Sequence, residues 1–210
     1  MKNTIAFIVV GLALIGALFV FYSKDASAPT ETPNSTPPPA QEGLPGMQTS
    51  DAPWKVELEH LRERLDAIGL PALAQEGMAL HTHQHLDIYI NGNTSMIIPA
   101  GIGMHQLENF ISPIHAHAPD NIIHIESPEI KDFTLGQFFD IWGVRFTTDC
   151  IGGYCASDDK ILRVFVNGSQ IQGDPRQIKL EELQEIVITY GTEQEMPNPI
   201  PQNYPSIPGE

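Results

Sequence analysis

The feature that most constrains this chain is a stretch of strictly alternating side chains from His81 to Ile90. Extended backbone directs successive side chains to opposite faces, so this pattern predicts a β-strand with one polar and one apolar face. The apolar side chains at positions 86, 88 and 90 are expected to face a core. The polar face is expected to carry His81, His83, His85 and Asp87.

A second histidine group lies between Ile114 and Glu126. Pro119, Asp120 and Asn121 separate two apolar alternating runs and are typical of a type I turn. A turn with its four corners at positions 118–121 predicts His115 opposite His124 and His117 opposite Ile122, with the three imidazoles on one face. Glu126 is expected farther along that face.

Alternating histidines on a strand favour metal binding, because neutral imidazole is the commonest metal ligand and neighbouring rings of the pattern point the same way. Imidazoles beside a carboxylate suit several transition metals, and outside the cytoplasm copper and zinc are expected, with copper slightly favoured. The alternative is a structural module in which the histidines are incidental. The predicted metal-binding residues are His81, His83, His85, His115, His117 and His124, with Asp87 and Glu126 as further ligands or as groups that orient the rings.

A mononuclear metalloenzyme is the alternative to a metal carrier or sensor. Gly77, His81, His83 and Asp87, followed by His105, resemble the metal-binding motifs of cupins, which implies an oxygenase with His105 as a further ligand. Three histidines with one open coordination position also suit a zinc hydrolase or lyase. The sequence does not decide between an oxygenase and a zinc hydrolase or lyase.

The N-terminus carries a run without charge from Thr4 to Tyr22, flanked by Lys2 and Lys24. As a helix it nearly spans a hydrocarbon core of ~30 Å, so we expect a transmembrane anchor over residues 1–24. A removable signal peptide is the alternative, because Ala26-Ser27-Ala28 fits a cleavage site. Residues 25–52, rich in Pro, Thr and Ser, predict a disordered linker. This arrangement places the domain outside the cytoplasm, at the cell surface or in the periplasm.

The rest of the chain predicts an α+β domain over residues 53–192, built mainly of antiparallel β-hairpins with two short helices, and a proline-rich tail over 193–210. The first helix is expected to begin near Asp51 or Pro53 and to end at Gly69. The second is expected between Phe133 and Gly143, with a capping box at its start. Further strands are predicted over 94–98, after a two-residue turn at 91–92, and over 161–166 and 185–190.

The net charge argues against one class of binding partner, and the cysteines indicate the compartment in which the protein folds. Twenty-six acidic against 11 basic residues give a formal net charge of -15, which argues against a nucleic-acid partner. No feature of the sequence identifies a protein partner.

Cys150 and Cys155 flank a Gly-Gly pair and predict a small disulfide loop in an oxidising compartment, with thiolate ligation or a redox role as the alternative.

Several motifs recur together in one known group of proteins. They are His81 to Asp87, Ser112 to His117, Ile123 to Pro128, Phe133 to Val144, Gly152 to Cys155 and Leu162 to Gly168. With these motifs, residues from about Leu80 to Thr192 resemble uncharacterised, membrane-anchored, histidine-rich extracytoplasmic proteins of prokaryotes. The resemblance implies a membrane anchor and an extracytoplasmic domain, and it implies no particular activity.

Overall fold

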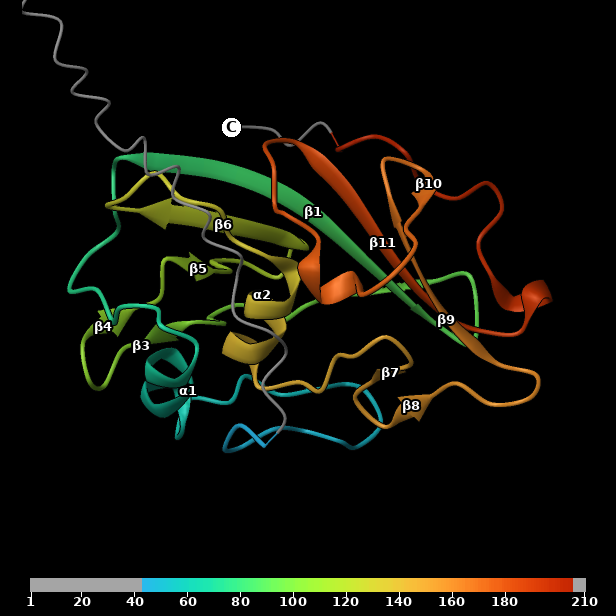
Figure 1. The fold of residues 1–210 in the computed structure, drawn as a ribbon, viewed down its shortest axis with the longest axis horizontal. Coiled ribbons are helices and arrows are strands. Elements are labelled where there is room, and N and C mark those ends of the chain that lie inside the picture. Colours follow the sequence, from blue (N-terminus) through green and yellow to red (C-terminus); the bar gives the residue numbers. More distant parts are fainter. Residues whose placement is uncertain (1–42, 206–210) are drawn as a thin grey trace, which may run out of the picture. The chain divides into compact units, whose positions relative to one another are not determined.

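The computed structural model describes residues 43–205, which form a mixed, sheet-rich domain with two short helices (Figure 1). The predicted anchor and most of the predicted linker, residues 1–42, lie outside the described residues, as do residues 206–210. Neither helix within the described part of the chain has the length and apolar character that a membrane span requires.

A seven-stranded sheet runs through the domain in the order β10-β9-β11-β1-β6-β5, and β2 pairs with β1 beside this path. Its strands are β1 (Leu80–Ile90), β2 (Ser95–Met96), β5 (Ile114–His115), β6 (Ile122–Ser127), β9 (Ile161–Val166), β10 (Ser169–Gln170) and β11 (Gln184–Gly191). Most neighbours are antiparallel, as predicted, but β1 and β11 pair in parallel. This parallel pair joins strands that are distant in sequence (Figure 1).

Two further two-stranded ribbons lie outside the main sheet. One pairs β3 (Met104–His105) with β4 (Phe110–Ile111), and the other pairs β7 (Cys150–Ile151) with β8 (Tyr154–Cys155). Two short 3-10 helices, η1 (Pro175–Gln177) and η2 (Glu193–Glu195), complete the regular structure of residues 43–205.

Helix α2 (Leu135–Trp142) begins and ends where the sequence predicts. The Thr134 hydroxyl accepts a hydrogen bond from the Gln137 amide at 3.4 Å, and the Gln137 side chain accepts one from the Thr134 amide at 3.0 Å. Gly143 ends the helix in the left-handed region, with φ 75°. Every residue of α2 is buried, and the helix packs against α1, β5 and η1.

Helix α1 (Leu61–Ala67) begins later than predicted, so the expected start near Asp51 or Pro53 is wrong. The Gln48 side chain explains the difference, because it donates to the Lys55 carbonyl at 2.9 Å and accepts from the Lys55 amide at 3.0 Å. These bonds hold the segment before the helix in a non-helical conformation. The predicted end is confirmed, since Gly69 follows the helix with φ 69°.

The segments that flank the predicted domain also contact it. Leu44, in the predicted linker, is buried in the core, and the Gln48 backbone amide donates to the Gly143 carbonyl at 2.7 Å. In the predicted tail, Ile200 packs against a small apolar cluster that contains Tyr89 and Phe165. Residues 43–52 and part of the tail therefore take part in the packing of the domain.

The hairpin after β1 is wider than predicted. Tyr89 pairs with Ser95, so residues 90–94 form the loop, and the return strand is limited to Ser95–Met96. The Asn121 side chain ends this strand early, because it accepts from the Ile98 amide at 2.9 Å and donates to the Met96 carbonyl at 3.2 Å. The predicted strand over 94–98 is therefore too long.

The two faces of β1 differ as the alternation predicts. Leu86 and Ile88 are completely buried in the main core, and Ile90 packs against it. The opposite face carries the histidines of the strand.

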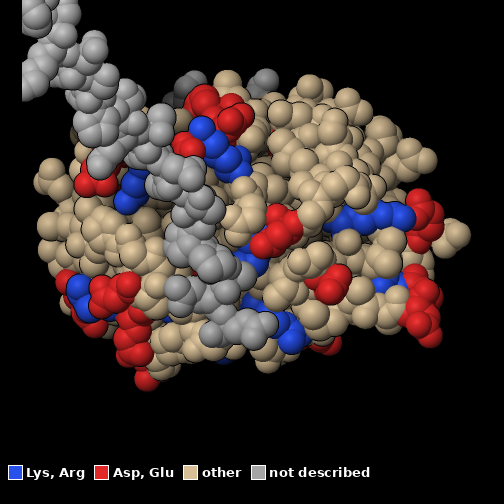
Figure 2. Space-filling view, in the orientation of Figure 1, with Lys and Arg blue, Asp and Glu red and all other residues tan. Residues whose placement is uncertain are grey.

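On the surface shown in Figure 2, Lys and Arg side chains lie among Asp and Glu side chains. The net negative charge is thus not gathered into one patch on that surface.

Candidate metal centre

Strand β6 lies between β1 and β5 (Figure 1). The register of these strands brings one histidine from each of them into a row. His124 on β6 is paired with His83 on β1 and with His115 on β5. The predicted register of His115 opposite His124 is therefore confirmed. In β1, His81 is paired with Glu126, which places this carboxylate beside the histidine row.

A first group of possible ligands consists of His81, His83 and His124, with one ligand atom from each within 4.8 Å of the others. The His83 ring lies 4.8 Å from the His81 ring and 4.8 Å from the His124 ring, between centroids. His83 is held in place by Glu182, which accepts a hydrogen bond from its backbone amide at 2.9 Å. The His81 ring lies at the surface, whereas the other two rings are half-buried.

A second group consists of Glu76, His115, His117 and Glu126, whose ligand atoms again lie within 4.8 Å of one another. The Nε2 atoms of His115 and His117 are 3.0 Å apart. His117 Nε2 lies 3.8 Å from a carboxylate oxygen of Glu76 and 3.8 Å from one of Glu126. His115 and Glu126 are buried, and Glu76 and His117 are exposed.

His117 reaches the second group by a route that differs from the prediction. The structure does not pair it with Ile122, because β5 ends at His115 and the Ala116 amide donates to the Ile102 carbonyl at 3.1 Å instead. The His117 ring nevertheless lies 4.4 Å from the His124 ring, between centroids. The prediction that His115, His117 and His124 lie close together thus holds, although the predicted pairing of His117 does not.

Glu76 is a member of the second group that the sequence did not reveal. Gly77, the residue after Glu76, lies against the end of β6, and its amide donates to the Glu126 carbonyl at 3.2 Å. A Cβ at Gly77 would lie 2.1 Å from the backbone nitrogen of Pro128, so only glycine allows this approach. Gly77 thereby sets the position of Glu76.

The protonation states of the buried imidazoles suit metal binding. The Nδ1 atom of His115 lies 2.8 Å from the Ser112 carbonyl, which can only accept, so Nδ1 carries the proton and Nε2 is unprotonated. Burial lowers the pKa of His115 to about 4. Burial, followed by the neighbouring imidazoles, lowers the pKa of His124 to about 3. Both rings are therefore neutral at pH 7, the form that binds metal.

Glu126 is surrounded by the imidazoles of both groups and is itself largely buried. Burial, together with the nearby Glu76 carboxylate, raises the pKa of Glu126. A cation bound between these side chains would offset the repulsion between the two carboxylates.

His85 and Asp87 do not join the first two groups but form a third group with Glu185 on β11. Glu185 is opposite His85 in the parallel pair, and its carboxylate lies 2.9 Å from His85 Nδ1. Burial alone would lower the pKa of His85, but the hydrogen bond and charge of Glu185 raise it. The third group thus already contains an internal hydrogen bond, and it remains a further set of side chains that could hold a metal ion.

A fourth group, Glu57, Glu59 and His60, also brings possible ligands together. Glu57 is engaged by the buried Arg64 guanidinium and by His60 Nδ1. Because a cationic side chain already neutralises this carboxylate, the group needs no metal ion.

His105, which the resemblance to cupins implies as a ligand, has a different environment. It stacks on Phe110 with ring centroids 5.1 Å apart, and its Nδ1 accepts from the Glu108 amide at 3.1 Å. Among residues 43–205, the group that contains His81 and His83 is completed by His124.

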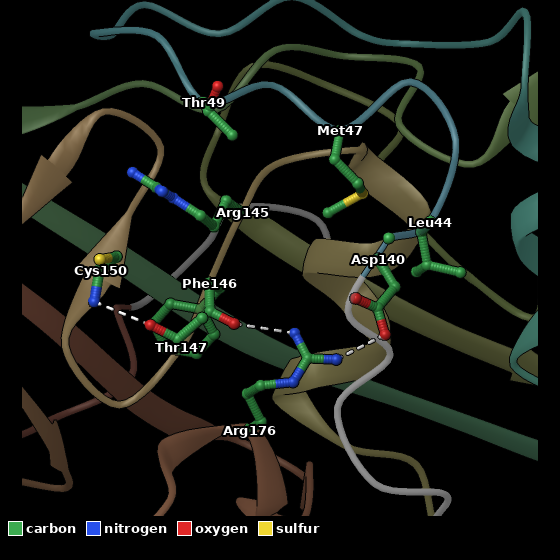
Figure 3. Close-up of a pocket in the computed structure, with 10 residues that line it drawn as sticks. Leu44, Met47, Thr49, Asp140, Arg145, Phe146, Thr147, Cys150 and Arg176 are labelled. Atoms are coloured by element: carbon green, nitrogen blue, oxygen red, sulfur yellow. Dashed lines mark hydrogen bonds and ion pairs between the residues drawn. The ribbon is translucent and has the colours of Figure 1, made fainter.

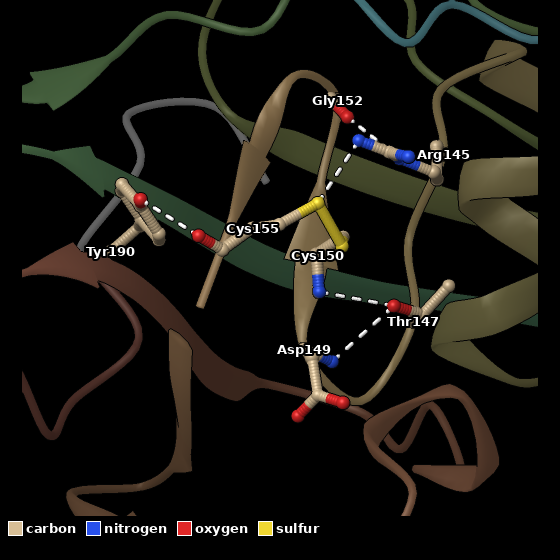
Figure 4. Close-up of a disulfide and its surroundings, with 7 residues drawn as sticks. All are labelled: Arg145, Thr147, Asp149, Cys150, Gly152, Cys155 and Tyr190. Carbon is tan, nitrogen blue, oxygen red and sulfur yellow. Dashed lines mark hydrogen bonds between the residues drawn. A yellow bond between two sulfur atoms is a disulfide. The ribbon is translucent and has the colours of Figure 1, made fainter. Parts of the chain in front are cut away.

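The two cysteines form the predicted disulfide, so they are not thiolate ligands (Figure 4). Cys150 and Cys155 are directly opposed across β7 and β8. The Arg145 side chain donates to the Gly152 carbonyl at 2.8 Å and contacts Cys155 Sγ at 3.1 Å, which fixes the ribbon to the preceding segment. A disulfide is typical of proteins that fold in an oxidising compartment outside the cytoplasm.

A pocket of about 420 Å³ lies beside the disulfide and is separate from the histidine groups (Figure 3). Leu44, Phe146 and other side chains line it, together with a buried ion pair between Asp140 and Arg176. Arg176 donates to Asp140 at 2.6 Å and to the Phe146 carbonyl at 2.9 Å. These polar groups therefore largely satisfy one another.

Comparisons of this chain with protein-family models, with curated proteins and with solved structures found no match. The candidate function therefore has to be argued from the geometry of the site.

Proposed function

We propose that this protein binds copper or zinc ions at its clustered histidines. The observation that carries the proposal is the convergence of seven ligand-type side chains at one end of the sheet, in two groups whose ligand atoms lie within 4.8 Å. We call this site the histidine centre, and it consists of Glu76, His81, His83, His115, His117, His124 and Glu126.

The donor set supports the choice of metal. Five imidazoles and two carboxylates suit Zn(II) and Cu(II), whereas Ca(II) and Mg(II) prefer all-oxygen sites. Of the methionines near the histidines in sequence, Met96 packs against the core and Met78 is exposed. Imidazole and carboxylate groups are therefore the donors on which the proposal rests.

The burial of the histidine centre suits a carrier or sensor. Its base is formed by the buried His115 and Glu126, and its rim by the exposed Glu76, His81 and His117. An ion at such a site can exchange with solvent or with a partner, whereas the open coordination position of a metalloenzyme is expected beside an enclosed cavity. The disulfide and the apolar N-terminal run support a membrane-anchored protein that acts in metal homeostasis outside the cytoplasm.

Metal content of the full-length chain, purified without an affinity tag and measured by inductively coupled plasma mass spectrometry, tests the proposal. The unmodified chain is expected to contain copper or zinc, or to take it up from a stoichiometric solution. The double variant His83→Asn/His117→Asn removes one imidazole from each group and is expected to weaken binding by more than the ~10–100-fold seen when residues around metal ligands are changed.

His105→Gln provides the matched control, because it changes a histidine outside the centre and should keep the metal content of the unmodified chain. Less than about a tenth of an equivalent of copper or zinc in the reconstituted chain would refute the proposal. Equal metal content in the double variant and in the control would refute the assignment to the histidine centre.

A further inference from the structure

The Glu126 carboxylate lies between the two groups of the histidine centre. One oxygen, Oε1, is 3.1 Å from His81 Nε2 in the first group. The other, Oε2, is 3.6 Å from His115 Nε2 in the second group. Oε1 also lies 3.8 Å from His117 Nε2 in the second group. The carboxylate therefore contacts both ligand sets, which is the position of a bridging ligand.

The two groups are also in direct contact through the His124 ring. Its centroid lies 4.8 Å from that of His83 in the first group and 4.4 Å from that of His117 in the second. The groups are therefore two halves of one continuous site.

Two buried polar atoms at this junction lack hydrogen bonds. Within residues 43–205, neither Glu126 Oε2 nor His124 Nδ1 has a hydrogen-bond partner. The Glu126 side chain is only 9 % exposed, so solvent offers little compensation. Leaving buried polar atoms unpaired is unfavourable, and a bound ion would satisfy both of these atoms.

The number of ligands exceeds what one ion can use. Zinc sites and many copper sites have four ligands. Three imidazoles and one Glu126 oxygen make four on the side of His81, His83 and His124. Two imidazoles, Glu76 and the other Glu126 oxygen make four on the opposite side. The two carboxylates would offset half of the four positive charges of two divalent ions.

We infer that the histidine centre holds two transition-metal ions bridged by the Glu126 carboxylate. This inference rests on the proposed function and gives it a stoichiometry. The first ion is held by His81, His83 and His124, and the second by Glu76, His115 and His117. Glu126 contributes one oxygen to each ion.

Native mass spectrometry of the full-length chain, titrated with Cu(II) and separately with Zn(II), counts the bound ions. Two ions per chain are expected. Glu126→Gln keeps the size of the side chain but removes its charge and one metal-binding oxygen. We expect it to bind its second ion at least tenfold more weakly.

Glu129→Gln makes the same chemical change at an exposed position near the end of β6 and should still bind two ions. His85→Asn tests whether the third group supplies one of the sites, and it should bind two ions as well. Electron paramagnetic resonance of the unmodified chain with two Cu(II) ions provides a readout that does not depend on any variant. A spin-coupled pair, visible as a half-field transition, is expected for neighbouring bridged ions.

The outcomes separate the inference from the proposed function. One ion per chain, or two ions without spin coupling, would overturn the bridged pair and leave metal binding intact. Loss of the second ion in His85→Asn but not in Glu126→Gln would also overturn it. Absence of any bound ion would overturn the proposed function and the inference together.

Discussion

His115 on β5 and His124 on β6 are directly opposed across an antiparallel pair, and their rings lie nearly parallel, with an interplanar angle of 4° and centroids 5.9 Å apart. Two stacked imidazoles cannot both become charged in a buried position without strong repulsion. The stability of the metal-free protein should therefore depend on pH.

We expect the free energy of unfolding of the metal-free chain to fall as the pH is lowered from about 6.5 toward 4. The pKa of His115 drops from 6.5 to about 4 on folding, so the unfolded chain binds a proton that the folded chain does not. This contribution is fully present above pH 6.5 and amounts to at most about 3 kcal/mol for this buried ring.

Urea denaturation in the presence of a chelator, at several pH values, measures this dependence. His115→Asn should show a shallower pH dependence than the unmodified chain, and the control His105→Gln should retain it. A free energy of unfolding that is constant or that increases between pH 6.5 and 4 would contradict the assignment of neutral, buried imidazoles.

Arg64→Ala should strongly destabilise the domain. The Arg64 side chain is completely buried and donates to the carbonyls of Asp140 and Ile141 at 2.7 and 3.1 Å, besides engaging Glu57. Its loss leaves the two buried carbonyls without this donor and removes the guanidinium from the half-buried Glu57 carboxylate. We expect this to lower the free energy of unfolding by about 3–5 kcal/mol. Arg62→Ala, in the same helix, removes an exposed ion pair with Glu108 and should lower it by no more than about 1 kcal/mol. Similar values for both variants in chemical denaturation would refute the distinction.

Gly77→Ala should impair metal binding as well as stability. The added methyl group would meet the backbone of Ser127 and Pro128 at 2.1 Å and force the Glu76 segment away from β6. Gly92→Ala is the matched change at a glycine with open space around its Cβ position. Calorimetric titration with Zn(II) should show weaker binding for Gly77→Ala only. Unchanged zinc affinity in Gly77→Ala would show that Glu76 is not a ligand.

Replacing both cysteines by serine should reduce stability without changing the metal content. The disulfide closes a short loop, with a sequence separation of 5, and constrains the unfolded chain by an amount worth roughly 2 kcal/mol. Because the histidine centre contains no cysteine, Cys150→Ser/Cys155→Ser should bind as many ions as the unmodified chain. A lower stoichiometry in the folded variant would assign the cysteines a role in metal binding.

Local sequence patterns predicted the parts of this structure that local contacts determine. The capping box of Thr134 and Gln137 and the terminal Gly143 located α2, because these residues satisfy the helix ends by themselves. The turn before β6 placed His115 opposite His124, because a short connection limits the possible registers. The alternation of polar and apolar residues located the two faces of β1, because extended backbone directs successive side chains to opposite faces.

Contacts between distant segments could not be predicted in this way. The parallel pairing of β1 with β11 leaves no local signal, so Glu185 could not be recognised as the partner of His85. Glu76 lies outside any regular pattern, and only the glycine after it hints at a close backbone approach. The late start of α1 likewise depends on the Gln48 side chain, which belongs to an earlier segment.

Anomalous diffraction at the copper and zinc absorption edges, from crystals of the metal-loaded full-length chain, tests the central claim most directly. The account predicts anomalous peaks within ~2.0–2.2 Å of ligand atoms in the histidine centre, on both sides of the Glu126 carboxylate. Peaks located only elsewhere on the protein, with the rings of His83, His115 and His124 free of metal, would contradict it.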